Sequence, residues 1–216
     1  MLFKDRYRVE STRLSNWNYG WNGCYFITIC TKNSKHYFGS VEIKKGQPKM
    51  ELSDIGMIAE ECWRDIPEHF PFIELGAFIV MPNHLHGIIF INKSNCENPT
   101  VETQDFASLH RNPTHDHEET QNLASLPQNM PKNQFGPQSR NLGSIIRGYK
   151  CGVTKYARGI DQNFCWLPLY YDTIIRNTKS YQRIENYIIS NPKNWAKDKF
   201  YSTDARSCVS TSKSYP

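Results

Sequence analysis

Hydrophobic and polar positions alternate with two periods in the first half of the chain, and each period predicts a type of element. Residues 25–31 (YFITICT) are β-branched and aromatic, which favours a half-buried strand. Residues 41–43 and 49–52 predict a small hairpin around the turn residues 45–48 (KGQP). A helix is expected next, because Ser53 or Asp54 can cap it, apolar residues recur at helical spacing, and Pro67 stops it.

The second half of the chain continues with the same two periods. Apolar runs at about 73–80 and 84–91 predict two strands joined by a tight turn at Pro82-Asn83. An amphipathic helix is expected from Leu142 to about residue 158, then a strand at about 169–175. Residues 179–190 repeat apolar positions every three or four residues and predict a last helix that ends at Asn191-Pro192.

Without the small hairpin, the first six elements read βαββαβ. This order predicts an α+β protein of the ferredoxin-like type, with an antiparallel sheet and two helices on one face. The strand at 84–91 is apolar on both faces, because His84, Ile88 and Phe90 alternate with Leu85, Ile89 and Ile91. Both faces should therefore be covered. The additional C-terminal helix is expected over the second face, which would bring Tyr187 towards the histidines.

Changes in composition divide the chain into segments. Residues 1–23 read as a basic and aromatic N-terminal arm, residues 24–198 as the main domain, and residues 199–216 as a polar tail. Within the domain, about 93–140 is rich in Asn, Gln, Pro, Thr, Ser and His with little periodicity, which is typical of a flexible insert. Three histidines of the insert could hold metal, but their low-complexity setting favours a solvated tract: His110, His115 and His117.

Charge and cysteine usage narrow the class of protein. The chain of 216 residues has a formal net charge of +5 and 13% aromatic residues, a combination that suits an anionic partner such as nucleic acid. Its seven cysteines are scattered and contain no Cys-x-x-Cys pair, which indicates reduced thiols. The N-terminus lacks an apolar signal core, and no apolar run approaches the roughly 18 residues of a membrane span. We expect a cytoplasmic protein with no membrane partner.

His84 and His86 are the residues that most directly suggest chemistry. Side chains in a strand alternate between faces, so both imidazoles should project on one side of the sheet. Such a pair could hold a divalent cation beside a substrate phosphate. The spacing alone equally fits two hydrogen-bonded histidines of the core.

Four sequence blocks follow one another along the chain: residues 25–31 (YFITICT), 80–87 (VMPNHLHG), 170–177 (YYDTIIRN) and 187–192 (YIISNP). The His84-Leu85-His86 triplet of the second block matches the histidine, hydrophobic, histidine motif of the HUH nucleases. More specifically, the four blocks together resemble the REP-associated tyrosine transposases, relatives of the single-strand insertion-sequence transposases. The resemblance covers most of residues 12–198 outside the insert.

The resemblance implies an activity and a set of site residues. Such enzymes cut single-stranded, hairpin-forming DNA with a tyrosine, which forms a 5′-phosphotyrosine link and leaves a free 3′-hydroxyl. The family nucleophile corresponds to Tyr187, and Mg²⁺ or Mn²⁺ would be held by His84, His86 and, four residues after the tyrosine, Asn191. Insertion-sequence relatives are dimers whose tyrosine serves the partner's histidines, whereas REP-associated members can act as monomers, so both states stay open.

Each assignment has a plainer alternative. Without the resemblance, Tyr187 could not be chosen over other tyrosines, and Asn191 could be a helix end before proline. Arg147 and Lys150 are expected to contact DNA phosphates or to form a solvated helix face. Three further residues of the arm, which could bind DNA or close the edge of the sheet, are Arg13, Trp17 and Tyr19. Two other functions compete with catalysis: a domesticated hairpin-binding protein that no longer cuts, and a metal-binding protein unrelated to DNA.

Overall fold

The computed structural model describes residues 17–93 and 139–201. Arg13, the three histidines of the insert, Cys96 and Cys208 therefore lie outside the described residues. In chain order, the elements are β1 (Gly23–Cys30), a 3₁₀ turn (Lys32–Ser34), β2 (Gly39–Lys44), β3 (Gln47–Leu52), α1 (Asp54–Arg64), α2 (Ile66–His69), β4 (Ile73–Met81), β5 (His84–Ile91), α3 (Leu142–Ile160), β6 (Tyr171–Ile175), α4 (Thr178–Asn194) and a second 3₁₀ turn (Trp195–Lys197).

The main sheet has the strand order β4-β5-β1-β6, and all neighbouring strands are antiparallel. The predicted ferredoxin-like α+β plan is confirmed, because β1 lies inside the sheet, between β5 and β6. β2 and β3 form a separate two-stranded sheet. Its turn residues Lys45 and Gly46 both have positive φ, the backbone conformation that a tight two-residue hairpin requires.

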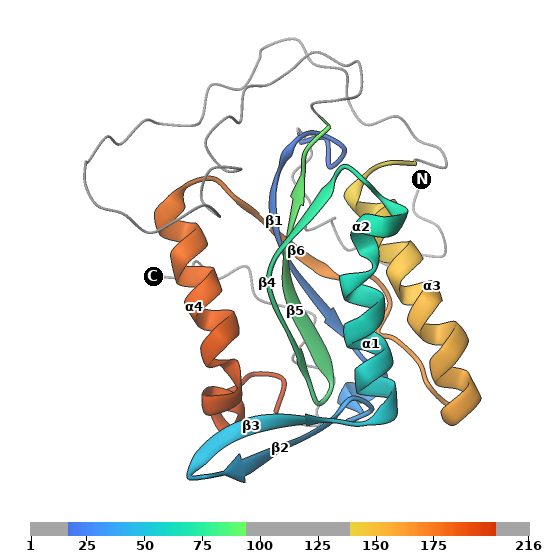
Figure 1. Ribbon diagram of the computed structural model, residues 1–216, viewed down its shortest axis with the longest axis vertical. Helices are drawn as coiled ribbons and strands as arrows, with labels where there is room; N and C mark the ends of the chain where they lie inside the picture. Colours follow the sequence, from blue (N-terminus) through green and yellow to red (C-terminus); the bar gives the residue numbers. More distant parts are fainter. Residues whose placement is uncertain (1–16, 94–138, 202–216) are drawn as a thin grey trace, which may run out of the picture.

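The two faces of the main sheet are covered by different helices. Figure 1 shows α1, α2 and α3 on one side of the sheet and α4 on the other. Leu85 and Ile89 of β5 pack in the large core beneath α1 and α3, whereas Ile88 and Phe90 pack against Tyr181 and Ile188 of α4. The prediction that the last helix covers the second face is therefore confirmed. None of the helices within the described ranges is long and apolar enough to cross a bilayer.

The last helix is longer than the sequence predicts. Proline disfavours a helical conformation in the residue before it, so the sequence predicts that the helix ends at Asn191-Pro192. Instead, α4 continues through Pro192 to Asn194, and the prediction of its end is wrong. The physical reason is packing, because Trp195 directly beyond the helix is buried against Met81 and Phe200 and holds the last turn against the sheet. Asn191 is consequently a helical residue.

Gly87 allows close packing between the sheet and α1. The ring of Trp63 lies over it, and a Cβ atom at residue 87 would be 2.3 Å from Trp63 Cζ2. We expect Gly87→Ala to lower the free energy of unfolding by about 1–3 kcal/mol through overpacking. Gly148→Ala is the control, because its added Cβ would meet only the Phe70 ring at 3.7 Å and alanine favours a helix. Urea denaturation measures both, and an equal response would contradict the role of Gly87.

Candidate active site

His84 and His86 lie at the start of β5 and both face α4. Their cross-strand partners on β1 are Cys30 and Thr28. The two imidazoles are 0% and 1% exposed, and their ring centroids are 4.5 Å apart. The alternation of the strand therefore brings the two rings together, as the sequence predicts.

Each histidine is oriented by a hydrogen bond at Nδ1. His84 Nδ1 lies 2.9 Å from Asn83 Oδ1, and His86 Nδ1 lies 2.8 Å from Thr28 Oγ1. An amide oxygen can only accept, so His84 donates from Nδ1 and keeps a lone pair on Nε2. Among the described residues, His84 Nε2 is buried and has no hydrogen-bond partner. A ligating histidine typically has this arrangement, with one nitrogen oriented by a neighbour and the other available.

Burial keeps both imidazoles neutral. Desolvation lowers the pKa of His84 well below its ordinary value, and the nearby His86 adds to the effect. Burial, with a smaller contribution from the charge of Lys199, lowers the pKa of His86 to about 3. At neutral pH both rings therefore retain the lone pairs that a metal ligand needs.

Tyr187 lies on the face of α4 that covers the histidines. Its Oη is 3.2 Å from His86 Nε2, and its ring makes an edge contact with Phe26, with centroids 6.2 Å apart. The side chain is 38% exposed, unlike Tyr181 of the same helix, which is 6% exposed. The hydroxyl thus reaches the buried histidine pair while part of the residue remains accessible to a substrate.

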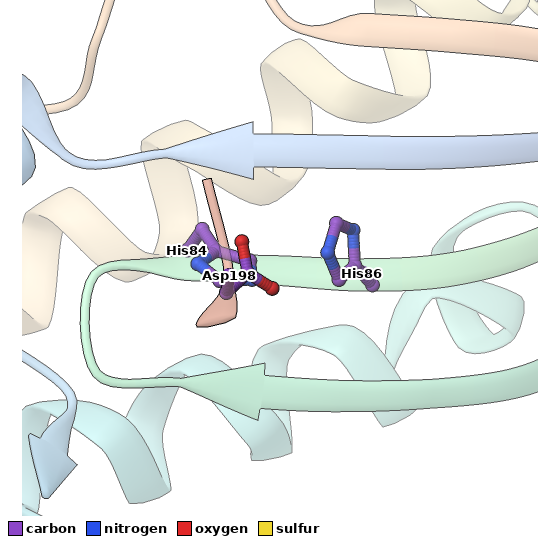
Figure 2. A group of neighbouring side chains, drawn as sticks. All are labelled: His84, His86 and Asp198. Atoms are coloured by element: carbon purple, nitrogen blue, oxygen red, sulfur yellow. The ribbon is translucent and has the colours of Figure 1, made fainter. Parts of the chain in front are cut away.

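Asp198 joins the histidines from the segment that follows α4. One candidate ligand atom from each of His84, His86 and Asp198 lies within 4.8 Å of the other two (Figure 2). Burial raises the pKa of the Asp198 carboxyl, while the Phe200 backbone N–H, 2.9 Å from Oδ1, opposes this shift. The sequence did not single out Asp198, because it lies in a polar stretch and only the chain reversal after α4 returns it to β5.

Asn191, the predicted third ligand, lies next to this group. It is 1% exposed, and neither polar atom of its side chain has a hydrogen-bond partner within ordinary distance and angle limits among the described residues. The amide is nevertheless close enough to Asp198 to favour its ionised form and lower its pKa. The Asn191 amide and His84 Nε2 are therefore two buried polar groups without a partner within these limits, and Asp198 lies close to both residues.

Aromatic residues after α4 cover the histidines. The Phe200 ring lies 4.5 Å from that of His84, and Trp195 lies 5.9 Å from the same ring. Asn83 Nδ2 donates to the Phe200 carbonyl oxygen at 2.7 Å. Phe200, in the segment expected to be a tail, is thus 4% exposed and packs directly on the site.

The predicted DNA-contact residues are distributed over the molecule. Arg147 and Lys150 lie on α3, across the sheet from the histidines. Tyr19 is 5% exposed and belongs to the core beneath α1 and α3, and Trp17 donates from Nε1 to the Tyr25 hydroxyl at 3.1 Å. Trp17 and Tyr19 thus make packing contacts within the protein, and their contact with DNA stays a prediction.

The donor set fits a divalent metal ion. Two neutral imidazole nitrogens and a carboxylate oxygen suit Mn²⁺ better than Mg²⁺, which prefers oxygen ligands. The unpartnered His84 Nε2 points to the same use. His84, His86 and Asp198 are therefore the described residues that could hold the ion, with Asn191 beside them.

Comparison with known proteins identifies relatives of the chain. No family model matches it. It is 37% identical over 196 residues to an uncharacterised protein of Haemophilus influenzae, a match that covers 89% of this chain and 92% of that protein. The structure of a REP-associated tyrosine transposase bound to a REP hairpin superimposes with a TM-score of 0.50 and 19% identity, over 89% of this chain and 77% of the other. The resemblance inferred from the four blocks is thereby confirmed at the level of the fold.

Proposed function

Because this chain belongs to one family with the Haemophilus influenzae protein and has the fold of the REP-associated tyrosine transposases, we propose that it cleaves and rejoins single-stranded DNA near hairpins. The observation that carries the proposal is the contact between Tyr187 Oη and His86 Nε2, at 3.2 Å. It sets an accessible tyrosine hydroxyl beside two buried imidazoles with a carboxylate close by. This combination fits a nucleophile next to a cation-assisted phosphate site.

In the proposed reaction, Tyr187 Oη attacks the phosphorus of a phosphodiester. The new bond joins the tyrosine oxygen to the phosphate, and the bond between phosphorus and the 3′-oxygen breaks. The phenol proton goes to solvent, which the partial exposure of Tyr187 permits, and the leaving 3′-oxygen takes a proton from solvent to become a hydroxyl. Attack by that or another 3′-hydroxyl on the phosphotyrosine reverses the step and rejoins a strand.

The chain's own residues prepare this step in two ways. Thr28 and Asn83 fix the two imidazole planes through Nδ1, so both Nε2 atoms are held in place. Trp195 and Phe200 exclude water from His84, which strengthens electrostatic interactions within the site. A bound Mg²⁺ or Mn²⁺ would act there as a Lewis acid on the phosphate and on the departing oxygen.

The proposed substrate is a hairpin-forming single strand. The structural neighbour was determined with a REP hairpin, and the net charge of +5 suits a DNA partner. An unpaired strand can bring its phosphate to a site beneath a covering helix, whereas a continuous duplex is too wide. Duplex DNA of the same sequence is therefore expected to be a poor substrate.

A cleavage assay on hairpin DNA with a single-stranded flank and Mn²⁺ tests the proposal. A covalent protein–DNA adduct that resists denaturation is the expected result. Hairpin binding without an adduct would instead indicate a domesticated hairpin-binding protein. Binding of metal without binding of DNA would indicate a metal-binding protein unrelated to DNA.

The contact between Tyr187 and His86 also supports a site completed within one chain. Both residues belong to the same chain and lie within hydrogen-bond distance. We therefore favour a tyrosine that serves its own histidines, in either a monomer or a dimer.

Thr28 is proposed to position His86. Thr28→Val keeps the branched shape but removes the hydroxyl that contacts His86 Nδ1, so we expect about 10-fold slower cleavage with unchanged hairpin affinity. Thr28→Ser retains a hydroxyl and should restore most of the rate. Single-turnover cleavage and DNA titration measure the two quantities, and equal rates for the valine and serine variants would exclude this role.

A further inference from the structure

A basic cavity lies on the α3 side of the sheet, away from the histidines. It is open to solvent and has a volume of about 660 Å³ between α3 and the segment before β6. Its lining includes four cationic residues and no acidic ones: Arg147, Lys150, Lys155 and Arg158. Within the part of the chain that the structure describes, Arg147, Lys155 and Arg158 form no salt bridge. The cavity therefore presents positive charge that suits an anionic ligand.

Lys150 shapes this cavity as well as charging it. Its Nζ donates to the carbonyl oxygens of Leu167, at 2.9 Å, and of Leu169. These bonds fix the segment before β6 against α3. Burial lowers the pKa of Lys150 to about 8, so the amine is still largely protonated at neutral pH.

Two consecutive tyrosines connect the cavity with the other face of the sheet. Tyr170 lines the cavity and packs with the core beneath α1 and α3. Tyr171 on β6 and His86 on β5 are both cross-strand partners of Thr28 on β1. Tyr171 therefore lies on the same face of the sheet as the histidines and in one cross-strand row with Thr28 and His86. It is 37% exposed. Because β6 is an edge strand, this pair spans the edge between the two faces.

We propose that the cavity binds unpaired nucleotides of the DNA, and that the same strand crosses the edge of β6 at Tyr170 and Tyr171 to reach Tyr187. The inference rests on the proposed function and extends it to the path of the substrate. The cations on α3 bind the phosphates, and Tyr170 offers a ring on which a base can stack. The volume matches a site for a small ligand such as one or a few nucleotides.

Neutralising a lysine of the cavity tests the binding part of this inference. In a Tyr187→Phe background, we expect Lys155→Gln to reduce the slope of log K against log salt by about 0.7, because one phosphate contact to a single strand is lost. At 0.1 M salt the same slope corresponds to about fivefold weaker binding. Fluorescence anisotropy with a hairpin that carries a single-stranded flank measures both. Arg158→Gln should reproduce the effect.

Lys49→Gln is the matched control, since Lys49 is an exposed lysine on β3 and does not line the cavity. A blunt hairpin without the flank should bind the Lys155 variant and the control equally. Equal binding of the flanked hairpin by the variant and the control would overturn the inference. An equal loss for flanked and blunt hairpins would overturn it too, because the cavity would then hold the stem.

Crosslinking tests the path of the strand. With 5-bromouracil placed at successive positions of the flank, ultraviolet crosslinks to Tyr170 and Tyr171 are expected at neighbouring nucleotides, with Tyr171 nearer the scissile phosphate. Crosslinks to Tyr171 without any to Tyr170 would contradict the path. These experiments need no cleavage. If no adduct forms on Tyr187 but Lys155→Gln weakens binding of the flanked hairpin, the proposed catalysis is wrong and the binding site stands. If the adduct forms but Lys155→Gln has no effect on binding, only the binding site is removed.

Discussion

Tyr187→Phe is expected to abolish the covalent adduct and leave hairpin binding nearly unchanged. The substitution removes one oxygen, the atom that would attack phosphorus, and keeps the ring that packs against Phe26. No other group in this position can form the phosphotyrosine bond, so the adduct should fall below detection, while binding depends on surfaces elsewhere. Denaturing gel electrophoresis with labelled hairpin DNA measures the adduct, and anisotropy measures binding.

Tyr181→Phe is the matched control on the same helix. Its hydroxyl lies 3.2 Å from Glu185 Oε1, and its ring packs against Phe90. Tyr181 has no part in the proposed cleavage. The adduct should form normally in this variant. An undiminished adduct in Tyr187→Phe would show that another tyrosine attacks, and Tyr171 would be the first to examine because it lies in the same row as His86.

Mixing two inactive variants tests whether one chain completes the site. Tyr187→Phe and His84→Ala each lack one part, and a mixture regains activity only if the tyrosine of one chain can serve the histidines of another. The contact between Tyr187 and His86 within one chain leads us to expect no recovery. Recovery of the adduct in the mixture would demonstrate exchange of the tyrosine between subunits.

Much of the fold follows from local periodicity. Alternation along β5 places His84 and His86 on one face, and the two apolar faces of that strand require the additional helix. The small hairpin follows from its turn residues, because Lys45 and Gly46 adopt the positive φ values of a tight turn. Such features depend on neighbours in sequence or on one strand, so the sequence carries enough information to predict them.

The features that sequence reasoning missed depend on long-range packing. Pro192 stays within α4 because Trp195 is buried beyond it, partly against Met81, which lies more than a hundred positions earlier in the chain. Asp198 reaches the histidines only because the chain turns back after α4, and the polarity around it gives no sign of this turn. Tyr19 occurs in a polar segment, yet it packs in the core.

The third metal ligand provides the second large expected effect. Asp198→Asn keeps the size of the side chain but removes its negative charge, and we expect Mn²⁺ affinity to fall by roughly 10- to 100-fold, with a parallel loss of cleavage. The reason is that a carboxylate balances the charge of the ion next to two neutral imidazoles, whereas an amide supplies only a dipole. Calorimetric titration with Mn²⁺ measures the affinity.

Asn191→Ala separates the two candidates, because Asn191 is the neighbour of Asp198. If Asp198 is the ligand, the alanine variant should bind Mn²⁺ almost as well as the unsubstituted protein and lose much less than Asp198→Asn. The reverse order of losses would identify Asn191, four residues after Tyr187, as the third ligand and would leave Asp198 as its hydrogen-bonding neighbour. Unchanged affinity in both variants and in His84→Ala would show that the metal binds elsewhere and would remove it from this site.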